Sequence, residues 1–320
     1  MALSTPSEVL PPIALQKTVE QAKEYMRQAK APNTVRAYRS DWRHFTDWCA
    51  QRGLPGLPAT EDTVALYLAD LASTVKTSTL QRRLSAIAQA HKTAGYDAPT
   101  AGANVRLTWA GIRRQKGTAQ EGKAPILTAD LRRLLATCEE GPLGTRDRAM
   151  LLVGFAGAFR RSELVSLDVA DLTFGTNGAT VRLRRSKTDQ EGHGETVGIP
   201  WGTTQETCPV LALQTWLEAA KLIDGAVFRP VDRHGNIKPQ RLSDRSVALI
   251  VKRHAEAAGL EASNYSGHSL RSGLATSAAM GGASERAIMR QTRHRSLPMV
   301  RRYIREGDLF RENAVAQAGL

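Results

Sequence analysis

The sequence is poor in cysteine, and its thiols show none of the spacings typical of a metal site or a disulfide framework. The three cysteines, Cys49, Cys138 and Cys208, are far apart in a chain of 320 residues, and none belongs to a CxxC pair. They indicate reduced, partly buried thiols of a cytoplasmic protein. The sequence also lacks an Asp/Glu/His cluster at metal-ligand spacing and a GxxxxGK[ST] motif. We therefore expect no metal, no ATP and no other cofactor.

Long apolar runs are absent as well. No segment approaches the length of a bilayer span, and no secretory apolar segment opens the chain, so we expect no membrane partner. Hydrophobic residues make up 42% of the chain and charged residues 23%, which predicts a soluble globular protein with one large core or two modest ones. The Pro-containing start, residues 1–14, is predicted to be a flexible tail.

Acidic residues are in deficit. The chain has 31 Asp and Glu against 44 Lys and Arg, which gives a formal net charge of +13. Such an excess of positive charge favours a polyanionic partner, and nucleic acid is the first candidate. The alternative is a basic surface kept for solubility, which is less favoured because acidic residues serve that purpose better.

Residues 15–112 have the periodicity of helices. In residues 33–53, apolar side chains recur every three or four positions and predict one buried stripe, formed by Val35, Tyr38, Trp42, Phe45 and Cys49. Similar patterns in residues 60–73 and 78–96, with further helical sequence after them, predict an all-α N-terminal domain.

Basic residues occupy other faces of these predicted helices. Such faces suit the major groove of DNA or its phosphates, and for any single residue a solvated basic face is the alternative. The candidates in this domain are Arg36, Arg39, Arg43, Arg82, Arg83 and Lys92. In the second domain, Lys252 and Arg253 of "VKRHAEAAG" form a similar pair.

Residues 113–125 are rich in Gly, Lys and Arg and lack apolar periodicity, which predicts a basic linker between two domains. This linker either follows a phosphate backbone or is a solvated tether. The second domain, residues 126–320, contains a segment at 145–159 that is apolar nearly all round, as in a buried helix.

A small antiparallel sheet is predicted next. Val181 and Leu183 alternate with Arg182 and Arg184, which is the pattern of a half-buried strand. A turn follows, and residues 196–200 have the pattern of the returning strand. The sequence is mainly helical after that, so the second domain is predicted to be α+β.

Several polar residues of the second domain have an ordinary explanation when each is taken alone. Arg160 and Glu163 have the spacing of a helical surface ion pair, and Lys187 stands at the tip of the predicted strand like any surface lysine. His268 and Arg271 in "GHSLRSG" would share one face of a helix. A lone tyrosine such as Tyr303 packs far more often than it reacts.

Together, polar residues of this domain follow a definite order, R…K…HxxR…H…Y. The members are Arg160, Lys187, His268, Arg271, His294 and Tyr303. This order resembles the catalytic signature of the tyrosine recombinases, the phage integrase family. The segment "RRSEL" resembles the family's first-arginine box, "GHSLRSG" its HxxR box, and the nine-residue step from His294 to Tyr303 its terminal box.

The resemblance covers almost the whole chain and implies a mainly α protein of two domains. The N-terminal helices resemble the family's core-binding domain, a SAM-like helical bundle. Residues from 126 onward resemble its α+β catalytic domain with a small antiparallel sheet. The compact layout, without a further arm-binding domain, is similar to that of the Cre-like recombinases.

The resemblance also implies a reaction. Tyr303 would attack a DNA phosphodiester and form a 3′-phosphotyrosyl link, and Arg160 and Arg271 would clamp the phosphate with paired hydrogen bonds. Lys187 would protonate the departing 5′-oxygen. No metal or fuel is needed, since the phosphotyrosine conserves the bond energy for religation.

Other residues receive supporting roles from the same resemblance. His268 would bind the phosphate and help to deprotonate Tyr303, and His294 would donate to a nonbridging oxygen. Glu163 would orient Arg160 or His268 from behind.

The family's mechanism implies an assembly on DNA. Four protomers on paired inverted-repeat sites would exchange strands through a Holliday junction, with or without accessory proteins. The protein would be cytoplasmic, associated with the nucleoid, and of bacterial or phage origin. The C-terminal residues resemble a tail helix that docks on a neighbouring protomer through Leu309, Phe310 and Val315. A helix packed on its own domain is the alternative.

One position departs from the family's pattern. Relatives often have Gly immediately before the last His, whereas this chain has Arg293. The departure falls on the loop that would position Tyr303. Two other functions stay open beside the recombinase: a topoisomerase with related phosphotyrosine chemistry, and a DNA-binding protein without catalysis.

Overall fold

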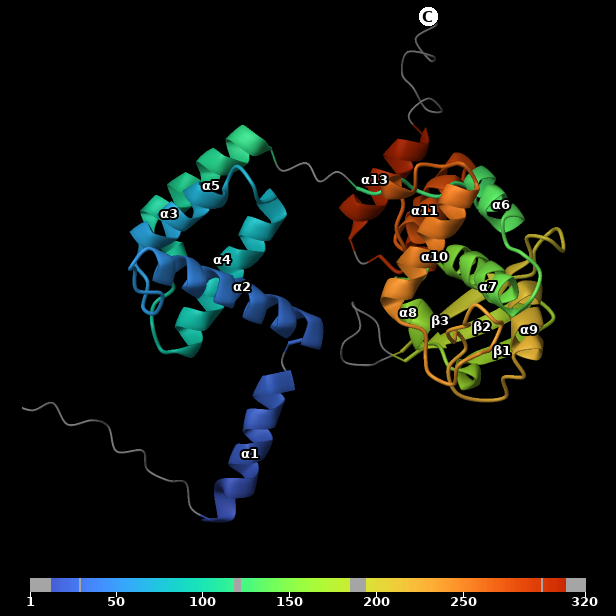
Figure 1. Ribbon diagram of the computed structural model, residues 1–320, viewed down its shortest axis with the longest axis horizontal. Helices are drawn as coiled ribbons and strands as arrows, with labels where there is room; N and C mark the ends of the chain where they lie inside the picture. The colour runs from blue at the N-terminus through green and yellow to red at the C-terminus, as the bar shows by residue number, and fades with distance from the viewer. Residues whose placement is uncertain (1–12, 29, 118–121, 185–193, 295, 309–320) are drawn as a thin grey trace, which may run out of the picture. The chain divides into compact units, whose positions relative to one another are not determined.

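The computed structural model describes residues 13–28, 30–117, 122–184, 194–294 and 296–308 (Figure 1). The chain divides into two compact units, the first ending at Glu121 and the second beginning at Gly122. Both are mainly helical, and the second adds a small antiparallel sheet. The predicted fold class is confirmed.

The described part of the first unit is helical. Its elements are α1 (Ile13–Gln28), α2 (Pro32–Gln51), α3 (Glu61–Leu71), α4 (Thr77–Thr93), a 3₁₀ turn (Pro99–Ala101) and α5 (Ala103–Lys116). Thr60 caps α3, because its hydroxyl oxygen accepts a hydrogen bond from the N–H of Thr63. Phe45 and Tyr67, fully buried with ring centroids 5.0 Å apart, belong to an apolar cluster that α2, α3, α4 and α5 share.

Some details of this unit differ from the sequence-based expectations. Val35 is 38% exposed, since it stands in the first turn of α2, ahead of the residues that enter the core. Residues 13 and 14, predicted as part of the tail, belong to α1. Helix α5 continues through Lys116, inside the segment predicted as linker, because basic side chains in a last turn favour the helix. It ends at Gly117, whose φ is +72°.

The second unit contains the remaining elements. They are α6 (Thr128–Ala136), α7 (Pro142–Ala156), α8 (Arg161–Ser166), a 3₁₀ turn (Val169–Asp171), β1 (Leu172–Gly175), β2 (Gly178–Leu183), β3 (Glu195–Pro200), α9 (Pro209–Ala219), α10 (Asp244–Ala257), a second 3₁₀ turn (Ala262–Asn264), α11 (Ser269–Met280), α12 (Glu285–Thr292) and α13 (Leu297–Asp308).

The sheet has the order β1-β2-β3 with antiparallel neighbours. Val181 and Leu183 are buried and Arg182 is exposed, as the alternation predicted, and Val181 lies opposite Leu172 and Val197. Strand β1 was not predicted from the sequence, because its four residues are too few to give a clear period. The inner face of the sheet belongs to the core of this unit.

Helix α7 lies at the centre of this core, as its all-round apolar pattern predicted. Most of its residues are buried, and it packs against α9 and α11 (Figure 1). Its C-terminal end faces the start of α8 and the first turn of α11, and both of these segments carry predicted site residues. The position of α7 therefore sets the position of the site.

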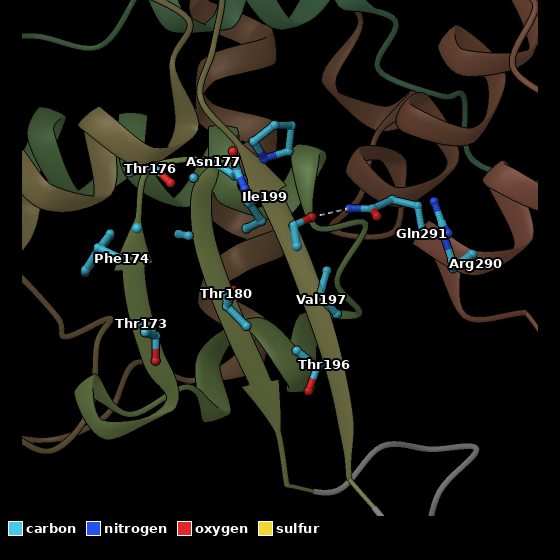
Figure 2. A pocket seen from close by; sticks show the side chains of 15 residues that line it. Thr173, Phe174, Thr176, Asn177, Thr180, Thr196, Val197, Ile199, Arg290 and Gln291 are labelled. Carbon is cyan, nitrogen blue, oxygen red and sulfur yellow. Dashed lines mark hydrogen bonds between the residues drawn. The ribbon is translucent and has the colours of Figure 1, made fainter.

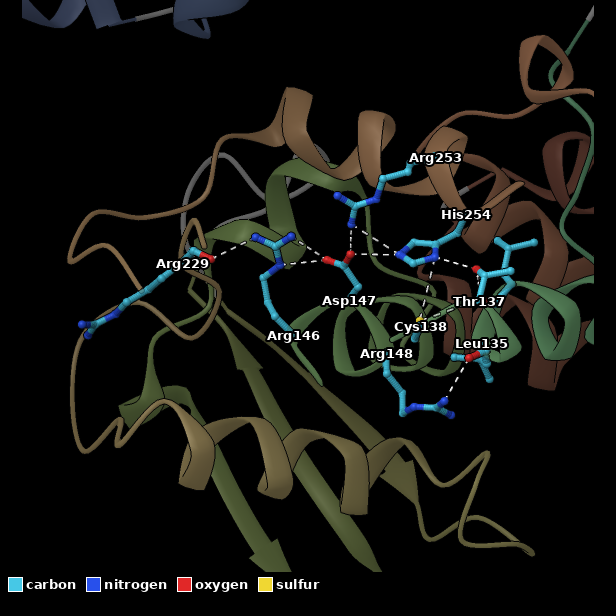
Figure 3. Close-up of polar contacts among 10 residues, drawn as sticks. Leu135, Thr137, Cys138, Arg146, Asp147, Arg148, Arg229, Arg253 and His254 are labelled. Carbon is cyan, nitrogen blue, oxygen red and sulfur yellow. Dashed lines mark hydrogen bonds and ion pairs between the residues drawn. The ribbon is translucent and has the colours of Figure 1, made fainter. Parts of the chain in front are cut away.

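Asp147 of α7 is the centre of a buried polar network (Figure 3). Its carboxylate accepts hydrogen bonds from Arg146 at 2.6 and 2.8 Å, lies 2.9 Å from Nε2 of His254, and pairs with Arg253. Burial alone would raise the pKa of Asp147, but the bond to His254 and the charges of Arg146 and Arg253 outweigh it and lower that pKa. The network joins α7 to α10.

Candidate active site

Arg160 and Glu163 meet at the start of α8. The N–H of Arg160 donates to Oε2 of Glu163 at 2.9 Å, and the guanidinium also hydrogen-bonds to Oε1. The first contact satisfies the N–H at the start of α8, so the segment "RRSEL" both begins α8 and brings the pair together. Because the Glu163 side chain is only 2% exposed, the pair is not an ordinary surface ion pair.

Arg271 lies in the first turn of α11 and is almost fully buried. Its Nη1 donates to the carbonyl oxygen of Ala158 at 2.7 Å, while its Nη2 has no hydrogen-bond partner among the residues that the structure describes. Burial first, and then the charges of Arg160 and Arg293, lower the pKa of Arg271. A buried guanidinium with an unused donor is a site that an anion would complete.

His268 and Tyr303 meet across α11 and α13. The distance between Nε2 of His268 and the hydroxyl oxygen of Tyr303 is 3.0 Å. His268 is exposed, and Tyr303 is only 9% exposed. Val300 and Tyr303 pack with Ala275 of α11 in a small apolar cluster, which holds α13 against α11. Apolar packing therefore delivers the phenol to the imidazole.

His294 lies near the Tyr303 ring, with ring centroids 5.8 Å apart. Its Nδ1 is 2.7 Å from Oγ1 of Thr292, and that hydroxyl donates its own hydrogen to the carbonyl oxygen of Ile288. Nδ1 of His294 must therefore be the donor, so Nε2 is unprotonated when the ring is neutral. Burial first, and then the charges of Arg271 and Arg160, lower the pKa of His294 to about 3.

Arg293 is the functional candidate whose surroundings the sequence did not foretell. It follows α12 in a left-handed conformation, with φ 55° and ψ 41°, and its side chain is 5% exposed. Its Nη2 lies 2.9 Å from Oε2 of Glu163, and its guanidinium stacks 5.1 Å from the Phe159 ring centre. The only sequence signal was an Arg at a position where the family often has Gly.

The end of α7 fixes these side chains through main-chain acceptors. Carbonyls at a helix end have no partner within the helix and can accept bonds from elsewhere. The oxygen of Ala156 accepts from Gln291 at 2.8 Å, that of Gly157 from Arg293 at 2.9 Å, and that of Ala158 from Arg271 at 2.7 Å and from Arg293 at 3.1 Å. Three successive carbonyls thus hold two later segments in register, the first turn of α11 and residues 291–293.

Gln291 extends this arrangement to the sheet (Figure 2). Its Nε2 also donates to the carbonyl oxygen of Gly198 in β3, at 3.2 Å. Strand β3 follows the predicted hairpin tip that carries Lys187. The turn before His294 is therefore tied both to the end of α7 and to β3.

The site is strongly positive. Arg160, Arg271 and Arg293 gather around the carboxylate of Glu163. A second carboxylate oxygen, Oε2 of Glu195, lies 3.7 Å from Nε of Arg293. Burial alone would raise the pKa of Glu163, but the hydrogen bond from the Arg160 N–H and the charges of Arg293 and Arg160 outweigh it and lower that pKa. Such a site can stabilise an anion that gains charge during a reaction. The part of the chain that the structure describes holds no cluster of residues suited to a metal ion.

The structure thus places five of the six predicted members in one neighbourhood. They are Arg160, His268, Arg271, His294 and Tyr303. Glu163 hydrogen-bonds to Arg160, as expected, and also to Arg293. Lys187 lies outside the described residues, as do the predicted tail contacts Leu309, Phe310 and Val315.

Most of the predicted nucleic-acid contacts are exposed. These are Arg36, Arg39, Arg43, Arg82, Lys92, Lys252 and Arg253. Arg82 donates to Asp41 at 2.6 and 2.9 Å, and Arg253 pairs with Asp147 (Figure 3). The placement of Arg83 on an outer face was wrong. Its side chain is only 12% exposed, because it lies over the ring of Tyr67 in α3 and near the carboxylate of Asp41 in α2.

Among the described residues, no helix has the length and apolar character needed to cross a membrane.

A helical unit followed by an α+β unit in which arginines, histidines and a tyrosine meet defines the class of the tyrosine recombinases. Residues 126–308 match the phage integrase family model, and residues 19–94 match the model of the phage integrase N-terminal SAM-like domain. The chain belongs to the phage integrase family and is a tyrosine-type site-specific recombinase.

Individual relatives agree with this assignment. An integrase/recombinase XerD homolog of Selenomonas ruminantium is 46% identical over 298 residues, which cover 92% of this chain and 87% of the relative. A tyrosine recombinase XerC of Herpetosiphon aurantiacus is 28% identical over 90% of each chain. Among solved structures, the fold is similar to a XerH site-specific recombinase bound to palindromic difH substrate, with TM-score 0.60, 18% identity and coverage of 81% of this chain and 71% of that one. The Tn1549 transposon integrase in complex with transposon right-end DNA also has TM-score 0.60, at 16% identity over 88% and 92% of the two chains.

Proposed function

We propose that this chain cuts and rejoins double-stranded DNA at specific sites through a covalent 3′-phosphotyrosyl intermediate. The observation that carries the proposal is the 3.0 Å distance between the Tyr303 hydroxyl and Nε2 of His268, close to the buried charge of Arg271. A phenol beside a ring nitrogen can lose its proton and become a nucleophile. Arginines stay cationic while they bind a phosphate.

The proposed cleavage step balances without a cofactor. His268 accepts the proton of Tyr303, and the phenolate oxygen bonds to the scissile phosphorus while the bond from phosphorus to the 5′-oxygen breaks. Arg160 and Arg271 bind the nonbridging oxygens, where negative charge grows. The departing 5′-oxygen takes a proton from Lys187, a role that the family resemblance assigns.

His294 would bind the phosphate only after its imidazole ring takes up a proton. As a neutral ring its Nε2 is an acceptor, so it cannot donate to a nonbridging oxygen. An arriving phosphodiester would favour protonation, because an adjacent anion stabilises the imidazolium. We infer that His294 takes up a proton as the DNA binds.

The proposed partner is double-stranded DNA with paired inverted-repeat sites. Four protomers would exchange strands in pairs through a Holliday junction, since each chain offers one Tyr303 and a full exchange cuts four strands. The net charge of +13 and the palindromic substrate of the XerH relative support this choice. Residues 15–112 would bind core DNA, residues 113–125 would link the domains, and residues 126–320 would carry out catalysis.

A nicked suicide substrate tests the reaction. The target site is first selected from a random DNA pool with the Tyr303→Phe variant, which should bind DNA without cutting it. Wild-type protein should then form a covalent adduct at the nick, and the variant should form none. A wild-type chain that binds the site but yields no adduct is a DNA-binding protein only. Adducts with relaxation of supercoils, but no inversion or deletion between paired sites, indicate a topoisomerase.

A further inference from the structure

Arg293 occupies a conformation that residues other than Gly rarely adopt. Its φ of 55° carries a backbone cost, and such a conformation persists where the surroundings determine it. Here the surroundings are four hydrogen bonds from one guanidinium, to three carbonyl oxygens and one carboxylate. The Arg293 side chain therefore holds its own backbone in place. Its positive charge interacts with buried acceptors and not with solvent.

Glu163 is shared between two cations. Its Oε1 bonds to the Arg160 guanidinium, while its Oε2 accepts from the Arg160 N–H and from Nη2 of Arg293, each at 2.9 Å. A buried carboxylate that loses its last cation is strongly destabilising. If Arg160 turned from Glu163 to a phosphate, Arg293 would still neutralise the carboxylate.

Arg293 also supports the second clamping arginine. The carbonyl oxygen of Ala158 accepts from Nη1 of Arg271 at 2.7 Å and from Nη2 of Arg293 at 3.1 Å. Arg293 thus contacts the partner group of each of the two arginines proposed to bind the phosphate. With its side chain 5% exposed, it reaches them from the interior.

We propose that Arg293 is a positioning residue that holds Glu163 and thereby frees Arg160 to bind the scissile phosphate. This inference rests on the proposed function. A purely structural role makes a different prediction. In a variant without Arg293, the Glu163 carboxylate would retain Arg160, and removal of that carboxylate would release Arg160 again.

Single-turnover cleavage of the suicide substrate tests this idea. Arg293→Gly should cleave about 10- to 100-fold more slowly from the preformed complex, in line with losses at other supporting residues. DNA affinity, measured in the Tyr303→Phe background, should be unchanged. Arg293→Lys keeps the charge without the fork and should fall between. The double variant Arg293→Gly/Glu163→Gln should cleave at least as fast as Arg293→Gly alone.

A matched control is available at Lys221. It is exposed and, like Arg293, has a positive φ, 49°, so Lys221→Gly changes a left-handed backbone without touching the site. This variant should cleave at the wild-type rate, and thermal melting identifies any variant that fails to fold. If Arg293→Gly misfolds, Arg293→Lys with and without Glu163→Gln gives the same comparison.

Three outcomes would overturn the inference. Cleavage by folded Arg293 variants at the wild-type rate removes the role, and a fall in DNA affinity equal to the fall in cleavage indicates a direct DNA contact. Losses that multiply in the double variant show that Arg293 acts independently of Glu163. By contrast, absence of any adduct from the wild-type chain overturns the proposed function itself, and this inference with it.

Discussion

The hydroxyl oxygen of Tyr303 lies 3.0 Å from Nε2 of His268, although 35 positions separate the two residues. This distance allows direct proton transfer from the phenol to the imidazole. His268→Gln should keep a polar group near Tyr303 but lose the base, and we expect adduct formation to slow by about 10²- to 10⁴-fold. Single-turnover assays at saturating DNA measure this, with Lys221→Gly as the unchanged control. Cleavage within a fewfold of wild type would assign the proton to another group.

We expect the buried Arg271 to lower the stability of the DNA-free protein and yet to be required for cleavage. Its Nη2 has no hydrogen-bond partner in the described part of the chain, so the DNA-free protein carries an incompletely satisfied guanidinium. Arg271→Met fills similar volume without charge, and we expect it to raise the free energy of unfolding by about 1 kcal/mol while it abolishes cleavage. Calorimetry and the suicide substrate give the two readouts. A clear loss of stability would show that Arg271 is already well satisfied without DNA.

Because of His294, we expect the free energy of unfolding to decrease at acidic pH. Its pKa in the folded protein is about 3, below the ordinary value of 6.5. As the pH falls below 6.5, the unfolded chain takes up a proton that the folded site resists, so the free energy of unfolding decreases toward pH 3. His294→Asn removes this group, and its stability should depend less steeply on pH in that window. Urea unfolding at several pH values compares the two proteins, and parallel curves would contradict the prediction.

Asp147 should matter to stability much more than its exposed partner Arg253. Asp147→Asn leaves the buried Arg146 without its charge partner, and we expect a loss of about 3–5 kcal/mol. Arg253→Ala should cost less, because the Arg253 side chain is 48% exposed and solvent screens the pair. Denaturant unfolding of both variants provides the comparison. Equal losses would mean that Arg253, rather than Arg146, neutralises the carboxylate.

The C-terminal tail is predicted to couple protomers. Deletion of the residues after Gly307 removes Leu309, Phe310 and Val315 and should abolish synapsis while sparing monomer binding to a single site. Gel-shift and sedimentation profiles on paired sites measure the assembly. An unchanged profile would assign the tail to its own domain.

The site could be predicted largely because the order of its residues along the chain resembles a family signature, and because several of them lie at short spacings. "RRSEL" and "GHSLRSG" each fix two functional groups within one helical turn, so local sequence alone brings Arg160 to Glu163 and His268 near Arg271. The fold class followed in the same way, from periods of helix and strand.

What the sequence could not reveal depends on distant contacts. Arg293 meets Glu163 and Ala158 across 130 and 135 positions, and nothing near Arg293 announces those partners. Arg83 has a charged side chain on a helix, yet it is half-buried because an aromatic ring of another helix receives it. The short β1 gave too few residues to establish a period.

The three successive carbonyl oxygens at the end of α7, those of Ala156, Gly157 and Ala158, form a row of acceptors that side-chain substitutions do not remove. Main-chain oxygens persist whatever side chain is present, so no simple substitution at Ala156 or Ala158 deletes an acceptor. Gly157 is constrained for another reason, since a Cβ there would lie 2.1 Å from the Phe159 ring. The site is instead sensitive to the length of α7. Insertion or deletion of one residue within α7 would rotate the row by about 100° and misplace every group that it holds.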